Sequence, residues 1–227
     1  RDLHSTSRRQ RQMCIRDSYG AAEAGRDYNT VDMSRVTAMN YYMRPYQAAV
    51  EAGVGSIMTS FNEFESIPAT GNTWLLNDVL RKQWGFNGFV VSDFTAIAEM
   101  VNHGIGNSQE VGVKALKAGV DMDMIADCYH AVLKKSLEEG KITEAEIDSA
   151  CRRILIAKYQ LGLFHDPYKY CNPKRAAKEF LSVNNVSAAR RIAAESFVLL
   201  KNDNNLLPLK GLSLIHISEP TRHLRIS

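Results

Sequence analysis

The stretch WGFNGFVVSDFTAIAEM, from Trp84 to Met100, carries the strongest structural signal in the chain. Phe89, Val90 and Val91 form a short apolar run, which is too short for a helix and typical of a fully buried strand. Asp93 follows the run, so a carboxylate stands at the carboxyl end of this predicted strand. In parallel α/β proteins, ligands bind and chemistry takes place at that end of the sheet.

Helix and strand signals alternate on both sides of this stretch. Asn107 with Glu110, and Thr143 with Glu146, form capping boxes that mark two helix starts. Pro45 lies inside the first helical pattern and predicts a kink or break there. The predicted order is helix 33–52, strand 55–61, loop 62–72, helix 73–84, strand 88–91, helix 107–118, strand 120–124, helix 127–139 and helix 143–160. This alternation predicts the α/β class, with a parallel sheet and crossover helices.

The two ends of the chain, residues 1–18 and 211–227, show no sustained period, and we expect them to be non-native or disordered tails. They also account for the formal net charge of +3. Residues 1–18 carry five Arg and two acids, and residues 211–227 carry two Arg and one acid, which leaves residues 19–210 at −1. The sequence therefore predicts no nucleic-acid partner, and no apolar run is long enough to predict a membrane partner.

The composition changes at GLFHDPYKYCNPKRA, which is rich in Pro, Tyr and Asn and has no period. We therefore expect residues 165–184 to be an interdomain linker. A predicted helix, 185–195, and the strand-like run SFVLLKN follow it, so residues 185–210 are predicted to begin a second domain. Three strands are too few for a finished sheet, so residues 19–164 are predicted to be the last part of a larger α/β domain.

The four cysteines, Cys14, Cys128, Cys151 and Cys171, are widely spaced and form no CxxC pair. No His stands at ligand spacing from any of them. We therefore expect neither a zinc site nor a disulfide framework.

Several motifs in fixed order resemble a known family. AAEAGRDYN, MTSFNE, IPATGN, WLLNDVLRKQWGFNGFVVSDF, HGIG, KALKAGVDMDM and KY-LGLF-DPY closely resemble glycoside hydrolase family 3, in its bacterial β-glucosidase branch. The resemblance implies that residues 19–164 are the C-terminal portion of a TIM-like (β/α) barrel, and that residues 185–210 begin an α/β sandwich domain. It also implies retaining hydrolysis of terminal β-D-glucosyl residues, with a small carbohydrate as substrate and with no metal or organic cofactor.

The resemblance assigns the nucleophile to Asp93, which occupies the aspartate of an SD[FWY] motif. A retaining glycosidase needs an ionised carboxylate that attacks the anomeric carbon and forms a glycosyl-enzyme ester. From spacing alone, the alternative is an Asp that caps a helix or bonds a loop. The resemblance also implies sugar contacts for Arg26, Met58, Phe61 and Phe94. The alternatives are a loop salt bridge for Arg26 and simple packing for the other three, and Phe61 lacks the hydroxyl that some relatives place near the nucleophile.

Three other carboxylates, Glu63, Asp121 and Asp123, are expected to be structural or to support the site. Asp121 and Asp123 alternate along one predicted strand and so point to the same face. His103 is expected to be a loop residue and not a base. By resemblance, the acid/base lies beyond Lys210, so we expect this chain by itself to be nearly inactive.

Other functions stay open at this point. A β-xylosidase or a broad β-glycosidase would share the family, and a non-catalytic barrel that binds carbohydrate would share the fold. A Schiff-base aldolase would need a Lys at a strand end, and none of the predicted strands supplies one. The resemblance favours a periplasmic or secreted location, and the sequence predicts no oligomeric state.

Overall fold

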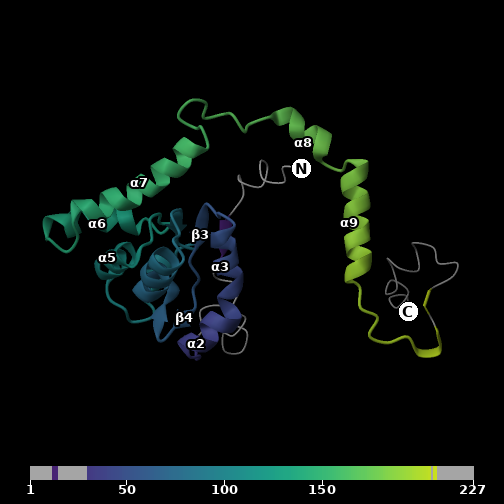
Figure 1. Cartoon of the computed structure of the whole chain (residues 1–227), viewed down its shortest axis with the longest axis horizontal. Helices are drawn as coiled ribbons and strands as arrows, with labels where there is room; N and C mark the ends of the chain where they lie inside the picture. The colour runs from purple at the N-terminus through teal and green to yellow at the C-terminus, as the bar shows by residue number, and fades with distance from the viewer. Residues whose placement is uncertain (1–11, 15–29, 206, 209–227) are drawn as a thin grey trace, which may run out of the picture. The chain divides into compact units, whose positions relative to one another are not determined.

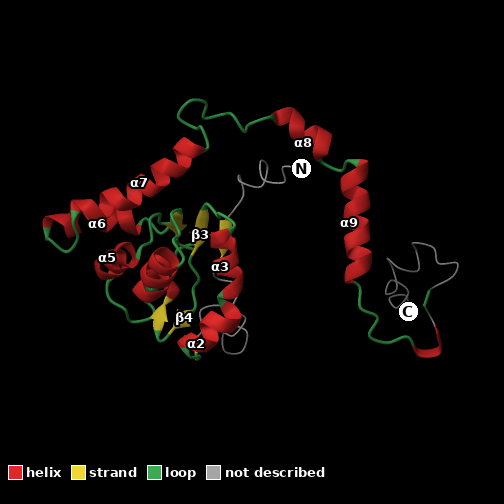
Figure 2. Ribbon diagram, in the orientation of Figure 1, coloured by secondary structure: helices red, strands yellow, loops and turns green. Residues whose placement is uncertain are grey.

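The computed structural model describes residues 12–14, 30–205 and 207–208 (Figure 1). The chain divides into two units, residues 1–169 and 170–227, and the boundary falls inside the predicted linker. The first unit mixes helices and strands, whereas the described part of the second contains only helices and loops (Figure 2). Among the described residues, no helix combines the length and the apolar character needed to cross a membrane.

The first unit is built around a parallel sheet. Its three strands lie in the order β1 (Gln12–Cys14), β3 (Ser56–Met58) and β6 (Phe89–Val91). Next to β6, the predicted strand 120–124 forms only a single parallel bridge, between Val91 and Met122. The N–H groups of Asp121 and Met122 both donate to the carbonyl of Val90, so the regular ladder is broken there.

The strand β1 corrects one expectation. Residues 1–18 were expected to lie outside the fold, but Gln12–Cys14 pairs in parallel with β3. The exposed edge of β3 offers unpaired backbone N–H and C=O groups, and an extended segment can satisfy them whatever its side-chain period. Backbone pairing therefore recruits residues whose side-chain pattern predicts no strand.

The predicted loop 62–72 contributes two strands to a second, smaller sheet, and Thr30–Val31 contributes the third. Its strands are β2 (Thr30–Val31), β4 (Glu63–Phe64) and β5 (Ile67–Pro68). The strands β4 and β5 form an antiparallel hairpin, and β2 pairs in parallel with β4. Glu65 and Ser66 form the turn with φ values of 54° and 61°. Glu-Ser is not the usual dipeptide for two positive φ values, so the sequence gives no hairpin signal here.

The first unit also contains helices and helical turns. They are α2 (Arg35–Thr37), the π-helix η2 (Ala38–Tyr42), α3 (Arg44–Glu51), the 3₁₀ turn η3 (Ala69–Gly71), the π-helix η4 (Trp74–Gln83), α4 (Ala96–Glu99), α5 (Ser108–Ala118), α6 (Cys128–Glu138) and α7 (Glu144–Gln160). Pro45 lies in the first turn of α3, after a break at Met43, which confirms the predicted interruption. Both predicted capping boxes are present, at Asn107 before α5 and at Thr143 before α7.

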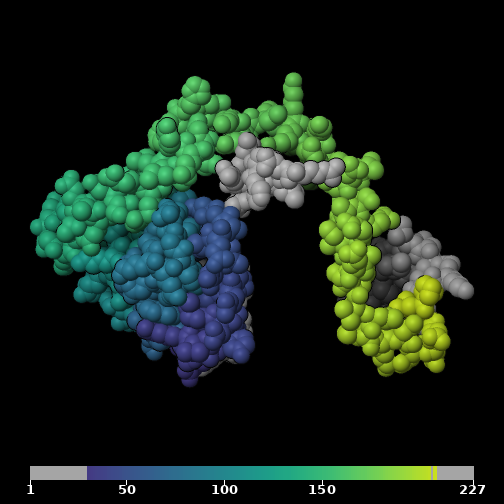
Figure 3. Space-filling view, viewed as in Figure 1, coloured from purple at the N-terminus to yellow at the C-terminus, as the bar shows by residue number. Residues whose placement is uncertain are grey.

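One face of the sheet makes the core. Ile57 of β3, Val90 of β6 and Val120 are fully buried and pack with apolar residues of the helices. The helical members of this cluster include Tyr46, Leu75, Leu76, Leu80, Val111 and Ala115. Figure 3 shows these segments, in purple, blue and teal, packed into one body. Burying this many aliphatic side chains is the main force that holds the unit together.

The described part of the second unit contains α8 (Pro173–Glu179), α9 (Val183–Ser196) and the 3₁₀ turn η5 (Asp203–Asn205). The helix α8 lies inside the predicted linker, where the Asn172 side chain caps it and Pro173 fills its first position. Residues 197–202, predicted to be strand-like, form no strand, and Phe197 to Leu200 are exposed. The described residues of this unit offer no other strand for them to pair with.

Candidate active site

Asp93 lies two residues beyond the end of β6, and the residue is 4% exposed. Its Oδ1 accepts a hydrogen bond of 2.6 Å from the backbone N–H of Phe94. Its carbonyl accepts a bond of 3.1 Å from the N–H of Ala96, and Thr95 between them has a left-handed φ of 57°. A tight turn at the carboxyl end of a buried strand therefore holds this carboxylate in place.

The register of the sheet shows which side chains share a face with Asp93. Met58 lies opposite Val91, and Val91 lies opposite Met122, so these three form one row across neighbouring strand positions. Side chains alternate between faces along β3 and β6, so Met58 and Val91 lie on the face opposite to Ile57 and Val90. Continued two residues beyond the end of β6, the same alternation assigns Asp93 to the face of Met58 and Val91.

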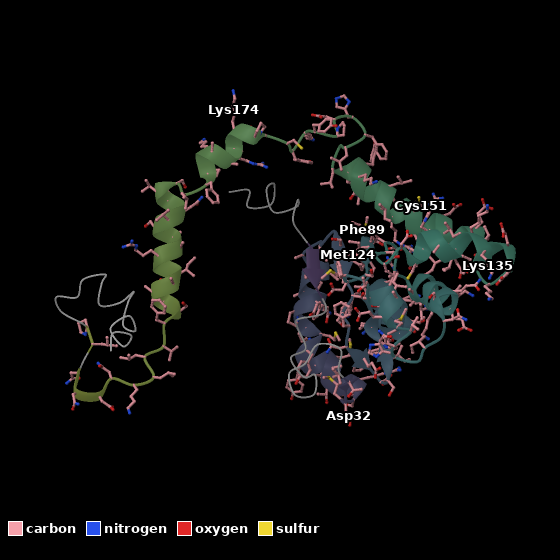
Figure 4. The ribbon with its side chains drawn as sticks, turned by 180° about the vertical axis from the view of Figure 1, so that it is seen from behind. Asp32, Phe89, Met124, Lys135, Cys151 and Lys174 are labelled. Carbon is pink, nitrogen blue, oxygen red and sulfur yellow. The ribbon has the colours of Figure 1, made fainter. Side chains whose placement is uncertain are left out.

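Backbone hydrogen bonds fasten the segments that carry Asp93 and Met124. The N–H of Ser92 donates to Met122 at 2.9 Å, and the N–H of Thr95 donates to Met124 at 3.1 Å. The Ser92 hydroxyl accepts a further bond of 2.8 Å from the N–H of Met124. Figure 4 labels Met124 together with Phe89, the first residue of β6. These bonds hold the backbone of Met124 against the residues on either side of Asp93, a neighbour that the sequence analysis did not single out.

The predicted sugar-contacting residues differ in their surroundings. Met58 ends β3 and is 9% exposed, and Phe61, in the loop after it, is also buried. Phe94 is 56% exposed, directly beside Asp93. Arg26 lies outside the described residues. The structure thus brings Met58 to the face of Asp93 and leaves Phe94 accessible, while the sugar contacts of all four stay predictions.

Asp121 is held inside an ion network beside Val90, the middle residue of β6. Its side chain is fully buried and accepts bonds from Arg81 at 2.6 Å, from Arg153 at 2.8 Å and from the N–H of Val90 at 2.8 Å. Arg81 also donates to the carbonyls of Gly88 and Gly119. Burial lowers the pKa of the Arg81 guanidinium, and Asp121 opposes that change. The network ties η4, β6 and α7 together, which fits the structural role expected for Asp121.

Asp123 serves the start of α6. Its Oδ2 accepts bonds from the backbone N–H groups of Cys128 at 2.7 Å and Tyr129 at 3.3 Å. A carboxylate at a helix N-terminus satisfies unpaired donors and complements the helix dipole. Burial, together with the charge of Asp123, raises the pKa of the Cys128 thiol to about 11. This carboxylate is committed to the helix, as expected for a structural residue.

Glu63 and His103 form a pair that the sequence does not show. The Nδ1 atom of His103 lies 2.6 Å from Oε1 of Glu63, and the two side chains are only 15% and 17% exposed. A carboxylate can only accept, so the imidazole ring is the donor. The pair joins the strand β4 to the turn between α4 and α5.

Two hollows at the surface of the first unit are lined by residues other than Asp93. One hollow of about 460 Å³ is lined by residues of α7, among them Cys151 and Tyr159, together with Phe164. Another of about 420 Å³ lies between α5, Thr73 and Lys141. Within the described ranges, no three His, Cys, Asp or Glu side chains gather as a metal site.

Comparison with known proteins gives a consistent picture. The family model described as "Glycosyl hydrolase family 3 N terminal domain" matches residues 17–157. A periplasmic beta-glucosidase of Salmonella typhimurium is 46% identical over 209 residues, which cover 89% of this chain and 27% of that protein. A beta-xylosidase of Formosa agariphila is 40% identical, with 78% of this chain and 26% of that protein covered.

Solved structures agree with these matches. A beta-glucosidase from Listeria innocua in complex with glucose has a TM-score of 0.77 and 45% sequence identity, covering 84% of this chain and 26% of that one. The chain thus spans about a quarter of the length of each of these relatives.

Proposed function

The chain belongs to glycosyl hydrolase family 3, and from that premise we propose that the protein is a retaining β-glycosidase that removes terminal β-D-glucosyl residues. The fold is the α/β fold of the family's barrel domain, of which this chain holds a portion. The observation that carries the proposal is the position of Asp93, a buried carboxylate held by a turn at the carboxyl end of β6. A small-molecule β-glucoside is the proposed substrate.

The proposed mechanism proceeds in two displacements. The carboxylate of Asp93 attacks the anomeric carbon, the bond to the leaving oxygen breaks, and a general acid protonates that oxygen. Water then attacks the same carbon, a base removes its proton, and the carboxylate of Asp93 is released. The hydrogen bond from the N–H of Phe94 fixes the plane of the carboxylate, so less of the attack geometry has to be found during the reaction.

A retaining enzyme also needs a second carboxyl group about 5 Å from the nucleophile. The other carboxylates discussed above are committed to structure: Glu63 to His103, Asp121 to two arginines and Asp123 to α6. We therefore assign none of them to the acid/base role.

A mechanism-based trap tests the assignment. The full-length protein is incubated with a 2-deoxy-2-fluoro β-glucoside that carries a good leaving group, and the modified peptide is sequenced by mass spectrometry. We expect an ester on Asp93, and no ester in the Asp93→Asn variant. Asp123→Asn is the matched control, because it changes a carboxylate on the neighbouring strand position while an amide oxygen can still cap α6. An ester on another residue, or no ester, contradicts the proposal.

A β-xylosidase is the second candidate, favoured by the similarity to the Formosa agariphila beta-xylosidase. Xylose lacks the hydroxymethyl group of glucose, so a site built for glucose should gain transition-state binding from that group. Comparing kcat/KM for nitrophenyl β-glucoside and β-xyloside with the full-length protein separates the two. A higher value for the xyloside selects the second candidate.

Two further proposals rest on the relatives. We propose export to the periplasm, which the similarity to the periplasmic enzyme of Salmonella typhimurium supports, and osmotic-shock fractionation of cells producing the full-length protein tests it. Residues 185–210 are proposed to begin an α/β sandwich domain. A crystal structure of the full-length protein, with residues 197–202 as a strand in a sheet, is the expected result.

A further inference from the structure

The loop between β3 and η4 is closed on itself by buried polar contacts. Thr59 and Thr70 share a hydrogen bond of 2.9 Å between their hydroxyls, and the side chain of Asn72 donates to the carbonyl of Phe64 at 3.3 Å. The N–H of Ala69 donates to the carbonyl of Asn62 at 3.0 Å. These bonds tie residues 59–72 into one compact piece.

The segment that follows Asp93 is also compact. The short helix α4 begins three residues after Asp93, and Met100 at its end is 1% exposed within the core. The N–H of Ile105 donates to the carbonyl of Met100 at 3.2 Å, which closes the turn that carries His103. The burial of Met100 and this hydrogen bond therefore connect the turn of His103 to the strand end at Asp93.

The pair between Glu63 and His103 joins these two pieces. Glu63 lies on β4, two residues after Phe61, and His103 lies ten residues after Asp93. Their contact of 2.6 Å, with more than four fifths of each side chain hidden from solvent, is short and well shielded. A hydrogen bond to a charged group under such burial is stronger than a surface ion pair.

We propose that Glu63 and His103 are positioning residues, which set the loop bearing Phe61 at its working distance from Asp93. The inference rests on the proposed function, because it takes Asp93 as the nucleophile and Phe61 as part of the sugar pocket. Loss of the pair lets the two pieces separate slightly, so that a bound sugar sits off the line of attack. Small misplacements of this kind slow the chemical step strongly while substrate binding changes less.

The test measures the rate of ester formation on Asp93 in the full-length protein, at increasing concentrations of the fluoro-glucoside. We expect Glu63→Ala and His103→Ala each to lower the saturating rate about tenfold, with a smaller change in the half-saturating concentration. Glu63→Gln should recover most of the rate, because its amide oxygen still accepts from His103. The double variant should be no slower than the single variants, since residues that act as a unit are not additive.

Glu65→Gln is the matched control. Glu65 lies in the same hairpin and pairs with Arg35 at 2.6 Å, but the two side chains are 38% and 51% exposed. The rate of this variant should equal that of the wild type. Melting temperatures, measured for every variant, show how much of each population is folded at the assay temperature.

The outcomes separate the two proposals. Equal labelling rates in the wild type and in the folded Glu63 and His103 variants overturn the positioning role, and so does a fall in melting temperature with no fall in rate. A failure of Glu63→Gln to recover any rate also contradicts it. If the wild type itself forms no ester on Asp93, the proposed function fails, and the positioning role falls with it.

Discussion

Replacing Asp121 by Asn is the sharpest test of how the first unit is held together. The substitution keeps the size and shape of the side chain and removes its charge. Asp121 is fully buried and bonded to Arg81, Arg153 and the N–H of Val90. In the variant, the amide can satisfy part of this set, but its NH₂ group faces donors, and two guanidinium groups lose their counter-charge.

The size of the effect follows from burial. Removing one partner of a buried ion pair costs about 3–5 kcal/mol, because the remaining charge is left uncompensated. The Arg81 and Arg153 side chains are 14% and 25% exposed, so water can partly solvate them. We therefore expect a loss at the lower end of this range, about 3 kcal/mol in the free energy of unfolding. With a urea m-value of about 2 kcal/mol/M, the midpoint falls by about 1.5 M.

Urea unfolding followed by tryptophan fluorescence measures this change. The chain has two tryptophans, Trp74 and Trp84, and both lie in or directly after η4 in the first unit. The signal therefore reports on the unit that contains the network. Asp78→Asn is the control, because Asp78 pairs with Lys82 on the same helix with both side chains well exposed. Its expected effect is below about 0.5 kcal/mol.

A result in which both variants shift the midpoint equally refutes this reasoning. It would mean that the buried carboxylate contributes no more than a surface charge. Asp121 would then lose its structural explanation.

Three smaller predictions follow. Gly88→Ala should lower the free energy of unfolding by about 2 kcal/mol or more, because its Cβ would lie 2.2 Å from the carbonyl oxygen of Gly55. A Cβ added at Gly55 meets nothing within 4 Å, so Gly55→Ala should change the melting temperature little. Equal shifts of the melting temperature in the two variants contradict this. Asn107→Ala should cost about 1 kcal/mol in urea unfolding through loss of the cap of α5, and no change would reject the cap. At pH 8 iodoacetamide should alkylate the exposed Cys151 far faster than Cys128, because the pKa of about 11 keeps Cys128 as the thiol. The alkylation rate of Cys128 should rise about tenfold per pH unit up to pH 10. Comparable rates, read by peptide mass spectrometry, would contradict the burial of Cys128.

Signals that act over a few residues predicted their structures well. The capping boxes at Asn107 and Thr143 begin α5 and α7 as expected, and Pro45 interrupts the first helical pattern. The apolar run before Asp93 is the strand β6, in parallel with β3. In each case, the interaction that fixes the conformation lies within a turn of the chain or follows from side-chain burial alone.

Features that depend on distant partners could not be predicted in this way. The strand β1 exists because β3 offers an open edge, and residues 197–202 form no strand because none of the described residues of their unit pairs with them. The hairpin formed by β4 and β5 has no turn signal at Glu65 and Ser66, the residues between its strands.

The candidate site also combines features that local sequence signals predict with features that depend on distant partners. Its position at the end of β6, with Asp93, follows from the local pattern and the family resemblance. The pairing of Glu63 with His103, forty residues apart, and the hydrogen bonds of Met124 to Ser92 and Thr95 required the folded chain. The physical reason is that a local pattern fixes backbone conformation and burial, while contacts between distant side chains depend on how strands and loops are brought together in three dimensions.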